Sequence, residues 1–432
     1  MIGRPTIFQA AVATLAGVGL LVAMPSDVPA ADDTALAAGV AKVDITPETP
    51  VRMYGYAARK TESEAVAGRL MATALAIGDD QGQGPAVLLA VDCGSVPRAI
   101  RDEVFRRVAA KHAVRPERFV LCNSHNHSGP NLKGMGSIQG AEHERLARYA
   151  DRLTERLASV VLEALASRRP AELAWSKGSV DFAANRRVLE DGKWVGFGAV
   201  PEAPVDHGLP VLRVTATDGK LLAVVVNYAC HNTTLRGNFK QIHGDWAGCA
   251  QEAFEAEHPG SRAVVTIGCG ADADPCPHGT VALCEQHGRA LAADVSRLLK
   301  GSTWQPVPPT LAARHAELEI PYSEESKSET FQITTWTFGD KLGMVFLSDE
   351  VVVDYARRLK RELDGDRLWI CAYSNDVSRY IVSKRLIGEG GYEVRSSLSS
   401  RVTEGHPEQL QPAMEDRIVE AVKSLLPASF SP

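Results

Sequence analysis

The chain has 432 residues, of which 45% are hydrophobic and 23% charged, and its formal net charge is -6 at pH 7. This composition is typical of a globular protein that is long enough for one large or two ordinary domains. Because the net charge is negative and no basic block occurs, the sequence argues against a nucleic-acid partner.

The N-terminal residues differ in composition from the rest. Arg4 gives a positive start, residues 7–24 form an apolar run, and Val28-Pro29-Ala30 offers small residues for cleavage. This order is typical of a secretory signal peptide, with a retained membrane anchor as the alternative. We therefore predict a signal peptide at residues 1–30 and a mature protein, residues 31–432, that is periplasmic or secreted.

Export raises the question of disulfide bonds, because the chain has eight cysteines. Most of them lie at the ends of apolar, strand-like runs, where cysteine usually behaves as a small buried hydrophobe. Cys276 and Cys284 instead lie in a predicted loop and at a predicted helix start, and these two could form a bridge. The sequence does not fix the pairing.

Strands and helices alternate along the chain. Apolar runs bounded by turn residues predict strands, and a 3.6-residue apolar period predicts helices. Predicted strands cover residues 41–46, 70–78, 86–91, 118–122, 221–228, 263–267, 311–320, 331–338, 342–347 and 368–371. Predicted helices cover 100–113, 141–167, 246–257, 282–299, 352–363 and 414–425, and the Pro-rich segment 306–309 is the one candidate linker. We predict an α/β fold, a single large domain of mixed β-sheets sandwiched by helices.

Ligand-type side chains recur just past the C-terminal ends of the predicted strands, where ligands and catalytic groups lie in α/β sheets. A single residue of this kind is usually part of a turn. Recurrence at six strand ends instead predicts one shared polar site there. The residues concerned are Asp92, His125, His127, His231, Asp272, Asp274, Glu350, Asn375 and Asp376.

His125 and His127 follow a predicted buried strand, and side chains two residues apart on an extended chain point to the same side. Two imidazoles and a carboxylate suit Zn²⁺ and leave a position for water, whose pKa the metal lowers to roughly 7. An imidazole beside the metal can carry the proton. Two alternatives stay open: an esterase or phosphoesterase that uses a second metal, and a non-catalytic module that binds a glycan or lipid.

Several blocks resemble the neutral/alkaline non-lysosomal ceramidases. Residues 123–130, Asn-Ser-His-Asn-His-Ser-Gly-Pro, are similar to the His-Thr-His-Ser-Gly-Pro signature of that family. Further blocks follow in the family's order, at residues 41–47, 53–57, 185–186, 228–234, 244–248, 374–380 and 392–393. The resemblance covers nearly the whole predicted mature chain and corresponds to the family's catalytic region.

The resemblance implies a ligand set and a reaction. One zinc ion per chain would be held by His125, His231, Glu350 and Tyr380. His127 would be the neighbouring acid and base. The implied step is attack of zinc-bound water on the carbonyl of an N-acyl amide, such as a ceramide-like lipid amide, with His127 passing the proton to the leaving amine.

The resemblance also implies substrate contacts. Arg186 and Tyr392 would face the substrate or its oxyanion. Asp274 stands where the family has an active-site serine, which argues against a serine nucleophile and points to altered head-group preference or a second divalent cation, for which Asp92 and Asp272 are further candidates. The implied partner is a small-molecule or lipid amide, with peripheral membrane contact as an option, and the sequence does not fix the oligomeric state.

Overall fold

The structure is a computed structural model that describes residues 1, 3, 36–321, 328–397 and 413–431. Contacts divide the chain into Met1–Asp33 and Thr34–Pro432, and every element below belongs to the second unit. The predicted signal peptide, residues 1–30, lies outside the described residues except at positions 1 and 3. None of the described helices is long and apolar enough to cross a membrane.

The largest sheet has nine strands in the order β12-β10-β9-β6-β1-β3-β4-β5, with β14 paired to β6. The pairs β4–β5 and β10–β12 are parallel. The strands are β1 (Leu36–Asp44), β3 (Met71–Ile77), β4 (Ala86–Val91), β5 (Phe119–Asn123), β6 (Arg169–Ser179), β9 (Gly208–Ala216), β10 (Leu221–Tyr228), β12 (Arg262–Ile267) and β14 (Gln305–Val307).

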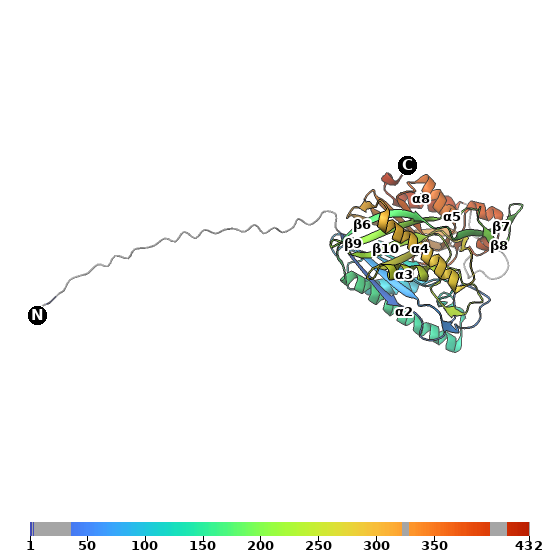
Figure 1. The fold of residues 1–432 in the computed structure, drawn as a ribbon, viewed down its shortest axis with the longest axis horizontal. Helices are drawn as coiled ribbons and strands as arrows, with labels where there is room; N and C mark the ends of the chain where they lie inside the picture. Colours follow the sequence, from blue (N-terminus) through green and yellow to red (C-terminus); the bar gives the residue numbers. More distant parts are fainter. Residues whose placement is uncertain (2, 4–35, 322–327, 398–412, 432) are drawn as a thin grey trace. The chain divides into compact units, whose positions relative to one another are not determined.

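Both faces of this sheet are covered, because alternate residues of its inner strands enter different cores. Leu89 of β4 packs in a cluster with Leu153 of a helix, whereas Leu88 packs with Trp336 of a second sheet. The helices are α1 (Arg98–Ala109), α2 (Gly140–Ala166), α3 (Asp245–Glu257) and α4 (Val281–Gly301), and Figure 1 shows α3 and α4 in front of β9 and β10. Burial on both faces explains why strands such as β4 and β10 are apolar along nearly their whole length.

The second sheet has the order β15-β16-β17-β19. Its strands are β15 (Leu311–Pro321), β16 (Ser328–Phe338), β17 (Leu342–Leu347) and β19 (Leu368–Cys371). Trp336 and Phe346 face the large sheet, whereas Ile333 and Val345 pack with α5 (Val353–Glu362) and α8 (Met414–Leu425). The layers are therefore helix, sheet, sheet and helix, which confirms the predicted class of mixed sheets between helices.

Three small sheets contain the remaining described strands. They pair β13 (Ala273–Pro275), β7 (Ala183–Glu190) and β8 (Lys193–Val200); β18 (Glu350–Val351) and β20 (Tyr380–Ile381); and β2 (Ala65–Val66) and β11 (Gln241–Ile242). Short helices α6 (Lys384–Glu389) and α7 (Tyr392–Arg395) follow β20. Single turns of 3₁₀ helix cover Pro116–Arg118, Met135–Ser137 and Ala428–Phe430.

Two possibilities that the sequence left open do not occur in the structure. The Pro-rich segment 306–309 is no linker, because β14 pairs with β6 and so belongs to the large sheet. All eight cysteines lie in the described part of the chain and all are free. Cys276 is exposed, whereas Cys284 is buried with its Sγ 3.7 Å from Oδ1 of Asp245.

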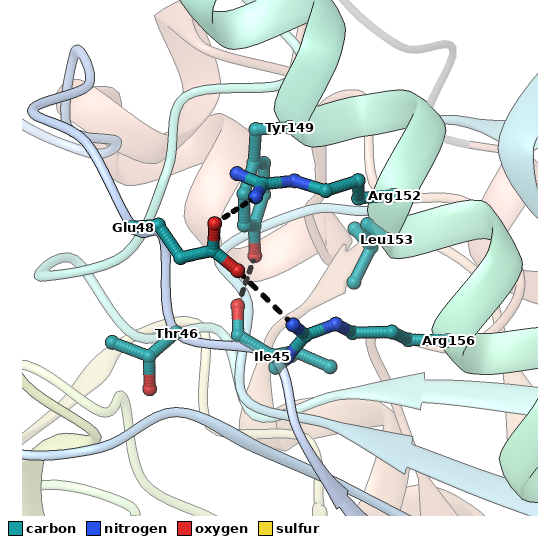
Figure 2. Close-up of a pocket in the computed structure, with 7 residues that line it drawn as sticks. All are labelled: Ile45, Thr46, Glu48, Tyr149, Arg152, Leu153 and Arg156. Carbon is teal, nitrogen blue, oxygen red and sulfur yellow. Dashed lines mark hydrogen bonds and ion pairs between the residues drawn. The ribbon is translucent and has the colours of Figure 1, made fainter.

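The loop after β1 is tied to α2, as Figure 2 shows. The hydroxyl of Tyr149 donates a buried hydrogen bond of 2.9 Å to the carbonyl oxygen of Ile45. Glu48 forms ion pairs with Arg152 and Arg156 at the surface. Exposed ion pairs contribute little to stability, so the buried hydrogen bond is the stronger anchor. This anchor fixes the start of the segment that continues to residues 53–59.

Candidate metal centre and substrate pocket

Three strand ends bring two imidazoles and a carboxylate together. His125 follows β5, His231 follows β10, and Glu350 opens β18. Oε2 of Glu350 lies 3.1 Å from Nε2 of His125 and 3.3 Å from Nε2 of His231. All three residues are buried. The ends of strands from both large sheets therefore meet at one point, as predicted.

Backbone carbonyls fix the proton positions of the two imidazoles. Nδ1 of His125 lies 2.8 Å from the carbonyl oxygen of Gly94, and Nδ1 of His231 lies 2.8 Å from that of Gly270. A carbonyl oxygen can only accept, so each Nδ1 carries a hydrogen and each Nε2 is the ring nitrogen that faces Glu350. Carbonyl partners of this kind orient the histidine ligands of metal ions.

The residues present therefore fit a metal ion. Oε2 of Glu350 is buried, and none of the described residues donates a hydrogen bond to it. Nε2 of His125, Nε2 of His231 and Oε2 of Glu350 thus converge, and each of these atoms can give an electron pair to a bound cation. Nitrogen and carboxylate oxygen ligands in this number suit Zn²⁺.

Tyr380 completes the predicted ligand set. The parallel pairing of β18 with β20 places Tyr380 beside Glu350. Its hydroxyl lies 3.4 Å from Nε2 of His231 and accepts a hydrogen bond of 3.1 Å from Nη2 of Arg186. Burial raises the pKa of Tyr380 well above 10, and the charge of Glu350 acts in the same direction, whereas Arg186 lowers it. The structure thus brings all four predicted ligands together.

His127 lies beside this set. Its Nε2 is 3.3 Å from Nε2 of His125, and one ring nitrogen each of His125, His127 and His231 lie within 4.8 Å of one another. Nδ1 of His127 is buried without a partner among the described residues. Burial, followed by the neighbouring imidazoles, lowers the pKa of His127 well below 6.5. The ring is therefore neutral at pH 7.

Unusual backbone conformations surround the centre. The prediction of an extended chain through His125 and His127 is wrong, because His125 has φ 53°. Tyr373 (φ 53°) and Asn375 (φ 63°) lie opposite this turn, where the backbone N–H of Asn123 bonds to the carbonyl of Tyr373. Left-handed conformations of residues other than glycine cost about 1–3 kcal/mol each and cluster at functional sites.

Arg186 has all three of its nitrogens engaged. Its Nε donates to Glu393 at 3.0 Å, its Nη1 to Asp274 at 3.1 Å and its Nη2 to Tyr380. Sequence reasoning missed Glu393, which is fully buried and also bonds Arg187. The resemblance implies a role for the adjoining Tyr392, and Glu393 belongs to the same block, residues 392–393. Arg186 is therefore held in place by the two carboxylates, and its Nη2 orients the Tyr380 hydroxyl.

A cavity of about 630 Å³ adjoins the centre. His127, Arg186, Asp274 and Tyr380 line it, together with Tyr392, whose side chain is partly exposed. The ring of Tyr392 contacts those of Phe197 and Tyr380, with centroids 5.2 and 5.6 Å apart. The predicted substrate-facing residues therefore share one pocket, of the size that small ligands occupy.

The remaining strand-end residues do not join the centre. Asp92 accepts hydrogen bonds from the backbone N–H of Met71 and from Gln251. Asp272 accepts from the backbone N–H of Val353, and burial raises the pKa of both aspartates to about 6. Among the described residues, neither aspartate belongs to the group of His125, His127 and His231, whose ring nitrogens lie within 4.8 Å of one another. Asp92 and Asp272 hold neighbouring segments instead.

Comparison with known proteins agrees with this geometry. Residues 36–304 match the model of the family described as neutral/alkaline non-lysosomal ceramidase, N-terminal. The crystal structure of neutral ceramidase from Pseudomonas aeruginosa is similar with a TM-score of 0.73 and 17% identity, over 93% of this chain and 76% of that one. A structure of ceramidase complexed with C2 has a TM-score of 0.73 and 16% identity, over 93% and 77%. These two likenesses show a shared fold, and the family match shows that the chain belongs to the neutral/alkaline non-lysosomal ceramidases.

Proposed function

We propose that this protein is a zinc-dependent hydrolase of N-acyl amides, with one zinc ion per chain and a ceramide-like lipid amide as the substrate type. The observation that carries the proposal is the convergence of His125, His231 and Glu350 beside the phenol of Tyr380. Membership of the ceramidase family supports the hydrolysis of an amide.

A zinc ion held by these residues would polarise the substrate carbonyl and lower the pKa of a water molecule. His127 would accept the proton of the attacking water and pass it to the amine nitrogen as the C–N bond breaks, giving a carboxylate and an amine. Its ring is neutral, its Nδ1 is without a partner among the described residues, and it lines the pocket beside the proposed ligands. A neutral imidazole in this position can accept a proton and pass it on.

Arg186 and Tyr380 would act together on developing negative charge. Arg186 is buried and donates to the Tyr380 hydroxyl, which favours the ionised phenol. Fixed donors in a water-poor site stabilise charge more strongly than donors in water. Phe197 and Tyr392 form an apolar side of the pocket on which an acyl chain can lie.

Metal content and activity test this proposal together. We expect about one zinc per chain, and we expect His125→Ala and Glu350→Ala to lose both metal and amide hydrolysis. His127→Ala should keep the metal while its turnover falls about 10²-fold or more. His112→Ala is the matched control, because His112 lies just after α1, outside the residues that line the pocket. Full activity in metal-free His125→Ala would overturn the proposal.

Export is part of the same proposal. Residues 1–30 would direct the chain to the periplasm or the medium, where it would meet lipid amides at a membrane surface. Fractionation of cells that express the full chain tests this step. Recovery of the uncleaved chain in the cytoplasm alone would contradict it, without bearing on the hydrolysis.

A further inference from the structure

One wall of the pocket carries an arginine that the proposed reaction does not use. Arg236 lies in the loop between β10 and β11, and 30% of its side chain is exposed. Its Nη1 donates to Oδ2 of Asp274 at 3.0 Å, and its side chain also lies beside the hydroxyl of Tyr56. A guanidinium has five N–H donors, so these contacts leave donors on a side chain that lines the pocket.

Asp274 is already neutralised by the protein. Its Oδ1 accepts hydrogen bonds from Arg186 at 3.1 Å and Thr233 at 3.3 Å, and its Oδ2 accepts from Arg236. Among the described residues that line the pocket, Asp274 is the one acidic side chain. Because the Asp274 carboxylate is already paired with two arginines, it does not offer a free negative charge to a cationic ligand. The side of the pocket around Asp274 and Arg236 instead offers hydrogen-bond donors.

The loop that carries Arg236 is held rigidly. The buried carboxylate of Asp245 accepts the backbone N–H groups of Thr234 at 3.0 Å and Leu235 at 2.8 Å. The hydroxyl of Tyr56 donates to the carbonyl oxygen of Leu235 at 3.0 Å. A binding group fixed in this way loses little conformational entropy when its ligand arrives. The arrangement is typical of a binding residue rather than of a mobile surface arginine.

A chain of polar contacts connects Arg236 to the residues beside the proposed metal site. Consecutive contacts of 3.0, 3.1 and 3.1 Å lead from Arg236 through Asp274 and Arg186 to Tyr380. Ala57, Phe197 and Ala199 supply apolar surface in the same cavity. A volume of about 630 Å³ holds roughly twenty groups of about 30 Å³, the share of one water molecule in the liquid. One acyl chain with a small head group fits this space.

We propose that the substrate carries an anionic group, in the simplest case the carboxylate of an N-acyl amino acid, and that Arg236 binds this group. The inference rests on the proposed hydrolysis of N-acyl amides, and it replaces the neutral head group of a ceramide by an anionic one. A planar guanidinium pairs with a carboxylate through two parallel hydrogen bonds, which lysine cannot match. Cleavage of the C–N bond by water would release a fatty acid and an amino acid.

Three substrates with one acyl chain test the inference. N-decanoylglycine, N-decanoyl-O-phosphoethanolamine and N-decanoylethanolamine share the amide and differ in a terminal carboxylate, phosphate or neutral hydroxyl. We expect wild-type kcat/KM to be at least about tenfold higher for the carboxylate than for the hydroxyl. Arg236→Gln should bring this ratio close to one, mainly through KM of the anionic substrate, and Arg236→Lys should give an intermediate ratio. A higher kcat/KM for the phosphate would support anion binding and assign it to phosphate.

Arg106→Gln is the matched control, because Arg106 lies on α1 with 70% of its side chain exposed and should leave the ratio unchanged. Equal kcat/KM for anionic and neutral substrates in the wild type would overturn the inference. An unchanged ratio in a folded Arg236→Gln variant would do so as well. If Arg236→Gln does not fold, Arg236→Lys decides, because a wild-type ratio in that variant also counts against the inference.

Failure of the proposed hydrolysis can be separated from failure of this inference. If none of the three amides is cleaved, calorimetric titration of N-decanoylglycine and N-decanoylethanolamine decides on binding alone. Tenfold tighter binding of the carboxylate to the wild type, lost in Arg236→Gln, would support the anion site while the hydrolysis is wrong. Equal affinities would overturn the anion site.

Discussion

Gly55 lies so close to His127 that a Cβ added to it would stand 2.2 Å from Cγ of the imidazole. Gly55 also has φ 96°, which side-chain-bearing residues rarely adopt. The rings of Tyr54 and Tyr56 stand edge-on to the imidazole, with centroids 5.4 and 5.1 Å away. Arg59 donates a hydrogen bond of 2.7 Å to the carbonyl oxygen of His127. The segment 54–59 thus holds the proposed proton carrier in place.

Gly55→Ala is expected to displace the ring of His127 without removing a proposed metal ligand. A misplacement of about 1 Å can cost roughly 10²-fold in rate, so kcat should fall by about that factor. Zinc content should stay at the wild-type value. Gly136→Ala is the control, because no atom lies within 4 Å of the added Cβ there. Wild-type kcat in Gly55→Ala would show that the position of this ring is unimportant for turnover.

Arg186→Gln is expected to destabilise the fold as well as to impair turnover. The substitution removes a buried cation from Glu393, Asp274 and Tyr380. Loss of one partner of a buried ion pair costs about 3–5 kcal/mol, and we expect the low end because Glu393 keeps Arg187. Urea unfolding measures the change in the free energy of unfolding. An unfolding midpoint equal to that of the wild type would contradict the structural role of Arg186.

Sequence pattern predicted the regular elements well where apolar residues form long runs. The strands at 86–91, 221–228, 342–347 and 368–371 and the helix at 414–425 have the predicted bounds. The two-residue strands β18 and β20 were missed because such short segments carry no period. They exist because Glu350–Val351 and Tyr380–Ile381 pair with each other, and this pairing sets the proposed carboxylate and phenol side by side.

Residue type alone could not separate ligand-type residues from structural ones. Asp92 and Glu350 both follow or open strands and both are buried. Asp92 accepts hydrogen bonds from Met71 and Gln251, whereas Oε2 of Glu350 faces two imidazoles. The difference depends on partners up to 225 residues distant, as for Glu350 and His125, in contacts that only the fold defines. The same holds for Arg236, which lies outside every block that resembles the family.

Removal of the metal is expected to lower thermal stability. A ligand that binds only the native state stabilises it by about 4 kcal/mol when its concentration is a thousand times Kd. Dialysis against a chelator should therefore lower Tm, and added zinc should restore it. His231→Ala should not respond to either treatment, whereas His127→Ala should respond like the wild type. An unchanged Tm in metal-free wild-type protein would count against a metal held by the native site.

Asp92→Asn is expected to change the pH dependence of stability. Burial raises the pKa of Asp92 to about 6, whereas 3.8 is its ordinary value, so the native state holds a proton that the unfolded chain releases between these values. The free energy of unfolding of the wild type should therefore fall as pH rises from about 4 to about 6, by about 3 kcal/mol at 1.36 kcal/mol per pKa unit.

In Asp92→Asn, the asparagine oxygen can accept from Met71, and the amide of Gln251 can rotate to accept from the asparagine NH₂ group. The variant should lack this fall, so its stability relative to the wild type should rise by about 3 kcal/mol between pH 4 and pH 7 in urea unfolding. Asp272, whose pKa burial also raises to about 6, is present in both proteins and cancels in the difference. A difference that stays constant over this range would show that Asp92 is ionised in the fold and that its two hydrogen bonds outweigh its burial.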